Sequence, residues 1–294
     1  MKEATAIIVL YYNKVRLTIQ CIQSILAARY PPGQVFCFDN GSSPDVAAQV
    51  RQFFPTCNHL GIPNNLGFSG GFNRSLAHVF SSTFTSAMFC TNDTHIQSHT
   101  VETCAATAAQ TRAGIVAPLI THLSNPDKID AIGAWFDKET GLLHHYQEQN
   151  LPILLAPDKD YIPGTALWIT KAAFTTLGGT DESFHMYWED VDLCFRAHQH
   201  HIPLARAYEA HIAHGGGQTC RKKPLYTTFY FQRNRIRFCQ RYLEGENKIK
   251  VLEIIQQELL QSSILWQQNN DQRRLNYFHQ LMQELTPSPY ASNT

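Results

Sequence analysis

The sequence lacks the features that carry a chain into or through a membrane. The first apolar run, residues 6–10, is shorter than the apolar core of a signal peptide, and no small-residue cleavage site follows it. The longest stretch without charge, residues 75–92, is broken by Ser, Thr and His side chains and would insert poorly into lipid. We therefore expect neither a secretory signal nor a membrane-spanning helix.

Excess charge of one sign and Cys-x-x-Cys pairs are missing as well. Because 24 Lys and Arg residues balance 24 Asp and Glu residues, the chain has no net field to attract nucleic acid, and we expect no nucleic-acid partner.

The eight cysteines are scattered, most of them in apolar segments: Cys21, Cys37, Cys57, Cys90, Cys104, Cys194, Cys220 and Cys239. We predict reduced, structural thiols rather than disulfides or a zinc site, and hence a cytoplasmic location.

Short apolar runs alternate with helical patterns in the first half of the chain. The spacing predicts strands at residues 5–10, 35–38, 58–60 and 86–90, and helices at about 19–26, 45–54 and 71–80. This order, with short connections, is typical of an α/β fold whose mostly parallel sheet is covered by helices on both faces. Beyond Gly114 the pattern is less regular, and from Pro224 it is helical almost to the end.

Polar residues follow each of the four predicted strands. Tyr12 and Asn13 come after the first strand, Asp39 ends the second, residues 65–73 follow the third, and Asp93 follows the fourth. Ligands bind such sheets in the crevice outside the carboxyl ends of the strands. We therefore predict a binding site at this edge.

The segment at residues 65–73, Asn-Leu-Gly-Phe-Ser-Gly-Gly-Phe-Asn, is the most specific of these clusters. Glycines at a strand-to-helix junction let backbone N–H groups approach a ligand closely, and a helix N-terminus favours a phosphate. The spacing is not Gly-x-Gly-x-x-Gly, and the segment follows the third strand rather than the first. The dinucleotide-binding fingerprint is therefore absent.

Two aspartates at this edge each have two interpretations. Asp39 would accept hydrogen bonds from a base or a ribose, or it would cap a helix or an Asx-turn, because Asp-Asn-Gly-Ser is also turn chemistry. Asp93 would hold a hard divalent cation together with substrate phosphates, or it would cap the next helix.

Carboxylates and an imidazole form candidate groups in the second half. Residues 187–193, Tyr-Trp-Glu-Asp-Val-Asp-Leu, contain three carboxylates. Glu189 and Asp190 are adjacent and face different directions, so only one of them can be a general base. The alternative is an acidic first helical turn. His214 precedes a glycine run, and it is either a metal ligand or a structural side chain.

Nine segments, taken in order, resemble inverting glycosyltransferases of family 2, which have the GT-A fold. The branch they resemble most is that of bacterial rhamnosyltransferase-like enzymes. The segments are residues 7–13, 38–42, 65–73, 91–94, 164–167, 178–182, 187–193, 214–216 and 230–235. The resemblance implies a Rossmann-like sheet flanked by helices.

The same resemblance implies a division of the chain. Residues 1–224 would form the catalytic domain, with a nucleotide-sugar-binding half at about 1–112 and an acceptor half at 113–224. Residues 225–294 would form a C-terminal helical extension.

By this resemblance the donor is a nucleotide-diphosphate sugar, either dTDP-rhamnose or a UDP-sugar. The residues that would frame it are Tyr12, Asp39, Asn65, Gly67, Phe68, Asn73 and Asn92. Asp93 matches the last acidic residue of the family's Asp-x-Asp-like motif. With His214 it would contact a divalent cation, Mg²⁺ or Mn²⁺.

The resemblance also implies the reaction, a single displacement in bacterial surface polysaccharide synthesis. Asp190 would take the proton of an acceptor hydroxyl on a glycan or lipid-linked glycan, and the metal would neutralise the departing nucleoside diphosphate. Trp188, Glu189 and Arg233 would lie on the acceptor side. Thr91 departs from the Asn or Asp that the family often has there, so metal binding would depend more on the donor diphosphate. Thr180 also departs from the pattern, because an aromatic residue is usual at that position.

Two other functions are considered. A nucleotidylyltransferase normally has a phosphate loop rich in glycine and basic residues after its first strand, where this chain has Tyr-Tyr-Asn-Lys at 11–14. A non-catalytic homologue is disfavoured by the presence of Asp93, Glu189 and Asp190.

The C-terminal part combines basic residues with an apolar stripe. The basic residues are Arg221, Lys222, Lys223, Arg233, Arg235, Arg237 and Arg241, and the stripe contains Val251, Leu252, Ile255, Leu259 and Leu260. One interpretation is packing on the catalytic domain or on a second subunit of a homodimer. The other is peripheral contact with the cytoplasmic face of the inner membrane.

Overall fold

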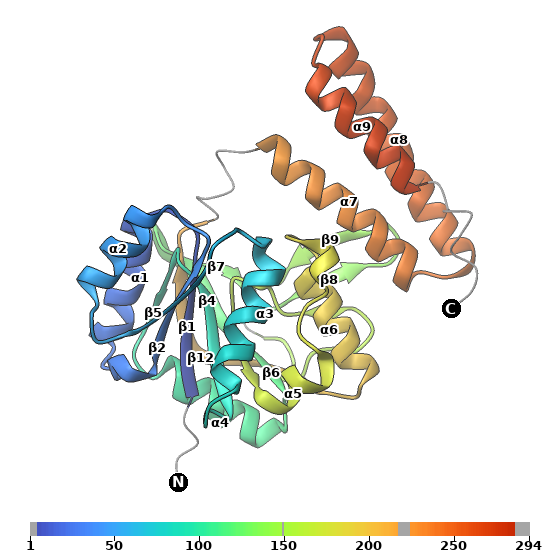
Figure 1. Ribbon diagram of the computed structural model, residues 1–294. Helices are drawn as coiled ribbons and strands as arrows, with labels where there is room; N and C mark the ends of the chain where they lie inside the picture. Colours follow the sequence, from blue (N-terminus) through green and yellow to red (C-terminus); the bar gives the residue numbers. More distant parts are fainter. Residues whose placement is uncertain (1–4, 149, 217–223, 286–294) are drawn as a thin grey trace.

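The structure is a computed structural model that describes residues 5–148, 150–216 and 224–285. Within these residues, nine strands form one sheet in the order β3-β2-β1-β4-β11-β6-β12-β5, with β7 paired to β6 (Figure 1). The first four strands are parallel, as predicted: β3 (Asn58–Ile62), β2 (Val35–Asn40), β1 (Thr5–Tyr11) and β4 (Ser86–Thr91).

The buried strand β1 shows why this half of the sheet is covered on both faces. Ala6, Ile8 and Leu10 pack on the face covered by α3 (Gly67–Phe80). Ile7 and Val9 point to the other face, covered by α1 (Val15–Ala27) and α4 (Thr100–Thr111). Because successive side chains of the strand point to opposite faces, they pack into two separate hydrophobic cores. The remaining helix of this half, α2 (Pro44–Phe53), follows β2.

The second half of the sheet is mixed, which the sequence pattern did not predict. Strand β11 (Ala166–Thr170) lies antiparallel between β4 and β6 (Ile115–His122). Strand β12 (Leu204–His214) is parallel to β6, and β5 (Thr94–Ile96) is antiparallel to β12 at the edge. The hairpin partner β7 (Asn125–Ala131) returns along β6.

A small second sheet connects these strands. Its order is β10-β8-β9, made of β10 (Asp160–Tyr161), β8 (Ala134–Asp137) and β9 (Leu142–His145). The chain therefore reaches β11 through antiparallel hairpins rather than through a crossover helix. This is why the direction of β11 reverses.

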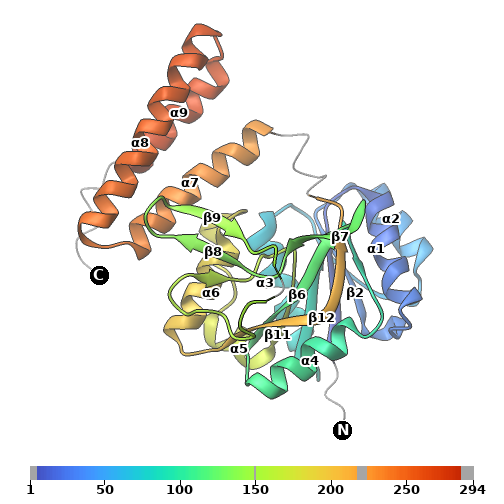
Figure 2. The same cartoon turned by 180° about the vertical axis from the view of Figure 1, so that it is seen from behind.

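Five helices complete the fold. They are α5 (Lys171–Leu177), α6 (Glu189–Gln199), α7 (Pro224–Tyr242), α8 (Gly245–Gln268) and α9 (Gln272–Leu285). Helix α7 belongs to the main core through Ile236, Phe238 and Cys239, which are fully buried. Helices α8 and α9 lie side by side and extend away from the sheet (Figures 1 and 2).

The apolar stripe of α8 is divided between two surroundings. Val251, Ile255 and Leu259 are buried in the same cluster as the α7 residues, as the packing interpretation predicts. Leu260 and Ile264 are exposed on the projecting part of the helix. In the described part of the chain, no helix combines the length and apolar character that crossing a membrane requires.

Three of the four arginines of α7 form ion pairs with other parts of the protein. Arg235 is buried and donates to Glu258 at 2.6 Å, Arg237 pairs with Glu284 at 2.7 Å, and Arg241 pairs with Asp181 and Asp192. These charges hold the C-terminal helices together and to the core. Arg221, Lys222 and Lys223 lie outside the described residues.

The seven described cysteines are all buried free thiols, as expected: Cys21, Cys37, Cys57, Cys90, Cys104, Cys194 and Cys239. Cys220 lies outside the described residues.

Candidate active site

The loops after β1 and β2 are tied to each other at the carboxyl edge of the sheet. The backbone N–H of Asn13 donates to Ser42 Oγ at 2.7 Å, and the Asn13 side chain accepts from the N–H of Ser43 at 3.1 Å. Asp39 is 8% exposed, and its Oδ1 accepts from the N–H of Ser42, three residues further along, so the carboxylate supports the loop after β2 without forming the two-residue bond of an Asx-turn. Tyr12 is half-buried beside these loops.

The glycine segment is used mainly for close packing. Helix α3 begins at Gly67, earlier than predicted, and Asn65 Oδ1 just before it accepts from the Gly67 N–H at 2.7 Å. A Cβ at Gly67, where φ is +74°, would lie 2.4 Å from His185. The N–H of Ser69 donates to the His185 carbonyl at 3.1 Å. The N–H groups of Gly67 and Ser69 therefore already have protein partners, so these two are not open to a phosphate in this conformation.

Asn40, which the sequence did not single out, joins β2 to this segment. It is 4% exposed, and its Nδ2 donates to the Gly67 carbonyl at 2.7 Å. Gly71 is required beside it, because a Cβ there would lie 2.9 Å from that amide nitrogen.

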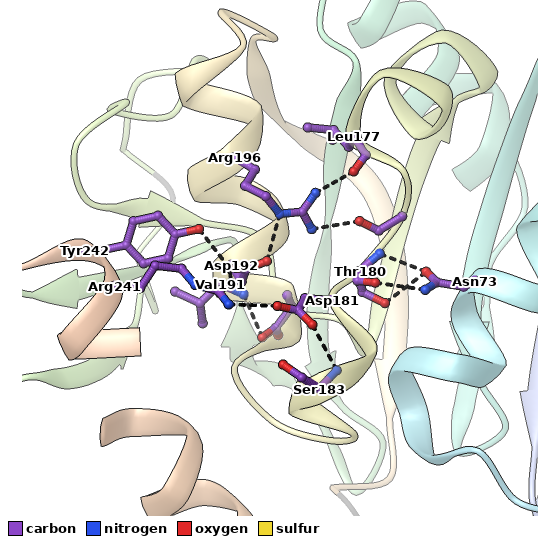
Figure 3. A network of polar contacts seen from close by, with 12 residues as sticks. Asn73, Leu177, Thr180, Asp181, Ser183, Val191, Asp192, Arg196, Arg241 and Tyr242 are labelled. Carbon is purple, nitrogen blue, oxygen red and sulfur yellow. Dashed lines mark hydrogen bonds and ion pairs between the residues drawn. The ribbon is translucent and has the colours of Figure 1, made fainter. Parts of the chain in front are cut away.

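Two asparagines predicted to frame the donor bind other parts of the protein. Asn73 exchanges hydrogen bonds with the Thr180 backbone, accepting from its N–H and donating to its carbonyl, both at 2.8 Å (Figure 3). Asn92 is 6% exposed, and its Nδ2 donates to Thr18 Oγ1 in α1 at 2.9 Å. Asn73 holds α3 to the loop before α6, and Asn92 holds the end of β4 to α1.

The predicted metal contacts Asp93 and His214 are brought together by the sheet. β12 pairs with β5 so that His214 lies opposite Thr94, and His214 Nε2 is 3.5 Å from Asp93 Oδ2. On its other side, His214 Nδ1 lies 2.8 Å from Asp130 Oδ2. The Thr91 hydroxyl donates to Asp93 Oδ1 at 2.7 Å.

Asp130 and His122 are members of this cluster that the sequence analysis missed. His122 Nε2 is 3.8 Å from Asp130 Oδ1. Both residues come from the β6–β7 hairpin, and no motif marks them because only strand pairing brings them to His214.

The two carboxylates determine the charge of the imidazole between them. Burial alone would lower the pKa of His214, but hydrogen bonds and charges from Asp130 and Asp93 raise it to about 9. Burial would raise the pKa of Asp93, but His214 and the Thr91 hydrogen bond outweigh it, and the pKa is lowered. At neutral pH the metal-free cluster therefore contains an imidazolium between two carboxylates.

This arrangement predicts a pH dependence of stability in the metal-free protein. Because folding raises the pKa of His214 from 6.5 to about 9, its stabilisation is complete below pH 6.5 and disappears as the pH rises through 9. The full effect is about 3 kcal/mol. Denaturant unfolding in EDTA should show a larger stability gap between wild type and His214→Gln at pH 6 than at pH 10. His211→Gln, on the same strand, is the control, and an equal gap at both pH values would contradict the assignment.

The chemistry of Asp93 and His214 suits a divalent cation shared with a ligand. One carboxylate and one imidazole leave most coordination positions to water and to phosphate oxygens, as is usual for Mg²⁺ sites. Among the described residues, no group of three or more His, Cys, Asp or Glu side chains is arranged to hold a metal by itself. Cation binding here would therefore depend on a diphosphate.

Asp190 and Glu189 differ sharply in their surroundings. Asp190 is half-buried; its Oδ2 accepts from the Gly164 N–H at 2.8 Å and its Oδ1 from the Val191 N–H at 2.9 Å. Glu189 is 4% exposed, and its Oε2 has no hydrogen-bond partner. Burial and the Asp190 charge raise the pKa of Glu189 far above its usual range. Burial also raises the pKa of Asp190, while the two N–H donors lower it. The net shift of the Asp190 pKa is upward and that of Glu189 is upward and larger, so Asp190 gives up its proton more readily than Glu189.

Of the residues predicted on the acceptor side, Trp188 is buried in the core and Arg233 is half-buried at the surface of α7. Trp188 is 1% exposed and packs against Phe136, Phe231 and Phe238. Arg233 donates to the carbonyls of Ser183 and Phe184. In this conformation Trp188 and Glu189 have almost no surface to offer an acceptor. Phe68 is half-buried, and its ring packs on Gly164, next to Asp190.

Asp192, the third carboxylate of the segment, anchors α6. It is fully buried and accepts from Arg196 at 2.8 Å, Arg241 at 2.6 Å and Tyr242 at 2.8 Å (Figure 3). Such complete pairing compensates for the burial of its charge. Asp192 therefore fixes α6, whereas Asp190 on the same helix retains an accessible side.

Three comparisons describe what the chain is similar to. The sequence profile described as "Glycosyl transferase family 2" matches residues 6–169. A "Low-salt glycan biosynthesis hexosyltransferase Agl10" of Haloferax volcanii is 25% identical over 187 residues, which is 60% of this chain and 57% of that protein. The chain thus matches little more than half the length of this curated relative.

Solved structures share the fold. A mannosyltransferase, PcManGT, from Pyrobaculum calidifontis in complex with GDP-Man and Mn²⁺ has a TM-score of 0.57 at 12% identity, covering 85% of this chain and 68% of that one. TarS 1–349 from S. aureus in complex with UDP-GlcNAc has a TM-score of 0.58 at 12% identity, covering 96% and 81%. The likeness confirms the expected GT-A fold: an α/β sheet flanked by helices, with helices at the C-terminus.

Proposed function

Because the chain belongs to glycosyl transferase family 2, we propose that it is an inverting glycosyltransferase, with Asp190 as base and a divalent cation held at Asp93 and His214. The donor is a nucleotide-diphosphate sugar bound at the carboxyl edge of β1, β2 and β4. The acceptor is a hydroxyl of a glycan or a lipid-linked glycan.

One observation carries this proposal: a continuous set of hydrogen bonds connects the two halves of the site. The Thr91 hydroxyl donates to Asp93 at 2.7 Å, and the Thr91 N–H donates to the Thr165 carbonyl at 3.0 Å. Gly164, the residue just before Thr165 in the same turn, donates its N–H to Asp190 at 2.8 Å. The candidate cation contact and the candidate base are thus both connected to the turn at residues 164–165, which precedes β11 and lies beside the end of β4.

The mechanism follows from these positions. Asp190 accepts the proton of the acceptor hydroxyl, while the Gly164 and Val191 N–H groups hold both of its oxygens in place. Its raised pKa makes it a better proton acceptor than an exposed aspartate, provided that it stays ionised. Burial and the Asp190 charge raise the pKa of Glu189, which opposes a second negative charge next to Asp190. A bound divalent cation would offset the charge that develops on the leaving diphosphate.

Tyr12 and Asp39 are the residues that we expect to lie nearest the nucleobase and the ribose of the donor. Asp39 Oδ1 is engaged by the Ser42 N–H, and we propose that the other carboxylate oxygen of Asp39 accepts from the nucleoside. Asn65, Gly67 and Phe68 shape the donor side next to Gly164. Asn73 and Asn92 support this shape through their bonds within the protein.

The donor and pathway are proposed more narrowly from the resemblance to rhamnosyltransferase-like enzymes. We favour dTDP-rhamnose or a UDP-sugar as donor and surface polysaccharide synthesis in the cytoplasm as the setting. The related structures contain GDP-Man or UDP-GlcNAc, so these donors belong in any screen. The exposed α8 residues Leu260, Ile264 and Leu265 support peripheral membrane contact or, alternatively, a homodimer.

A donor screen tests the proposal. The unfolding temperature should rise with one nucleoside diphosphate plus Mn²⁺ or Mg²⁺, and by less in EDTA, because a ligand that binds only the folded state stabilises it. UDP, GDP and dTDP are compared first, followed by hydrolysis or transfer from UDP-glucose, UDP-GlcNAc, GDP-mannose and dTDP-rhamnose. The corresponding nucleosides are the controls. A protein that no diphosphate stabilises and that turns over none of these donors would not be this enzyme.

A further inference from the structure

The turn before α6 has a backbone that most residues avoid. His185 (φ +63°), Tyr187 (φ +65°) and Trp188 (φ +72°) all have positive φ, although none is glycine. At His185, ψ is −54°, and the Met186 N–H donates to the Phe184 carbonyl at 2.7 Å, which makes a γ-turn of the rare, strained type. Such conformations persist only where the surroundings enforce them, and they cluster at functional sites.

One side chain of α7 meets this turn at three points. Asn234 is fully buried, and its Nδ2 lies 2.8 Å from the carbonyl oxygens of Phe184, Met186 and Tyr187. An amide nitrogen has two hydrogens, so at least one of them is shared between two carbonyls. No other type of side chain of this size offers two fixed N–H donors without a charge. Arg233 adds a donor to the Phe184 carbonyl at 3.1 Å.

The same turn is in contact with both halves of the candidate site. The His185 carbonyl accepts from the Ser69 N–H on the donor side. Trp188 is the N-cap residue of α6, so the turn determines where the first turn of that helix, including Asp190, begins. Because Asp190 faces Gly164 from this first turn, a shift of the strained backbone moves the carboxylate.

We propose that Asn234 is a positioning residue: it holds the 184–188 turn in its strained form and so places the Asp190 carboxylate for proton transfer. This inference rests on the proposed function of Asp190. It also assigns a role in the reaction to α7, a helix that lies outside the part matched by the family profile. Effective proton transfer depends on geometry at the level of an ångström. Loss of the hydrogen bonds between Asn234 and the turn should therefore reduce turnover rather than donor binding.

The experiment compares Asn234→Ala with wild type on the donor that turns over fastest in the screen above. The expected result is a fall in kcat of about 10–100-fold, with the Kd of the matching nucleoside diphosphate and Mn²⁺ changed less than about twofold. Asn247→Ala is the matched control, because its exposed amide donates to a single carbonyl, that of Lys138, away from this turn. If Asn234→Ala does not fold, Asn234→Leu, which keeps the volume and removes the donors, takes its place.

A second variant separates positioning from general destabilisation. Tyr187→Gly removes the cost of a positive φ at that residue, so in the Asn234→Ala background it should restore a large part of the lost kcat. Equal losses of kcat and diphosphate affinity, or a double variant no better than Asn234→Ala, would overturn the proposal. So would full activity of Asn234→Ala. If wild type itself turns over no donor, the proposed function fails instead, and the two failures are distinguishable.

Discussion

Replacing Asp190 with Asn should reduce sugar transfer by about 10²–10⁴-fold while leaving nucleoside diphosphate binding almost unchanged. The amide has nearly the shape of the carboxylate, but it cannot take up the acceptor proton. The measurement is steady-state transfer with the best donor, combined with calorimetry of the nucleoside diphosphate. A loss confined to kcat indicates an interaction made in the transition state.

Glu189→Gln is the matched control for that variant. Glu189 is buried, and burial together with the Asp190 charge raises its pKa well above the usual range, which favours the protonated form and makes an amide a conservative replacement. We expect transfer by Glu189→Gln to stay within about tenfold of wild type. If Asp190→Asn keeps near-full activity and Glu189→Gln loses it, the two roles are reversed. Loss of diphosphate binding in Asp190→Asn would instead mean that the carboxylate is structural.

Replacing Asp93 with Ala should weaken Mn²⁺-dependent binding of the nucleoside diphosphate by about 10²-fold, since even outer-shell partners of a metal contribute 10–100-fold. Binding of the bare nucleoside, which has no diphosphate to share a cation, should change little. Calorimetry with Mn²⁺ and in EDTA measures both. In EDTA the variant and wild type should bind the diphosphate with similar affinity.

Asp127→Ala is a suitable control, because Asp127 is an exposed carboxylate on β7. It tests whether removal of any nearby negative charge alters diphosphate binding. Equal losses of nucleoside and diphosphate binding in Asp93→Ala would show that Asp93 only supports the fold, through its contacts with Thr91 and His214.

The first half of the fold could be predicted because its signals are local. Strand β1 alternates between two buried faces, and the helices after it repeat their apolar residues at helical spacing. The second half depends on pairings between distant segments, such as His214 with Thr94 and Ala166 with Cys90. No periodicity within a single segment contains that information, so β5, β6, β7 and β12 were not predicted.

The candidate site, like the fold, could be predicted only in part from the sequence. Asp93, Asp190 and His214 could be proposed because they match a familiar order of motifs, and the structure places each beside polar partners. Asn73 and Asn92 belong to the same motifs, but their amides bind Thr180 and Thr18. A polar residue that supports a loop cannot be distinguished by sequence from one that contacts a ligand. Only the geometry of its partners does so.

The antiparallel strand β11 has a mechanical consequence. It is hydrogen-bonded to β4 from Ala166–Cys90 to Thr170–Ser86 and also to β6, so the parallel strands β1 to β4 and the strands β6 and β12 belong to one continuous sheet. Two lobes joined by a flexible linker could open and close around a substrate, but these halves could separate only by breaking the ladder between them. Any motion that accompanies binding at the carboxyl edge therefore belongs to the loops that follow the strands, not to the sheet itself.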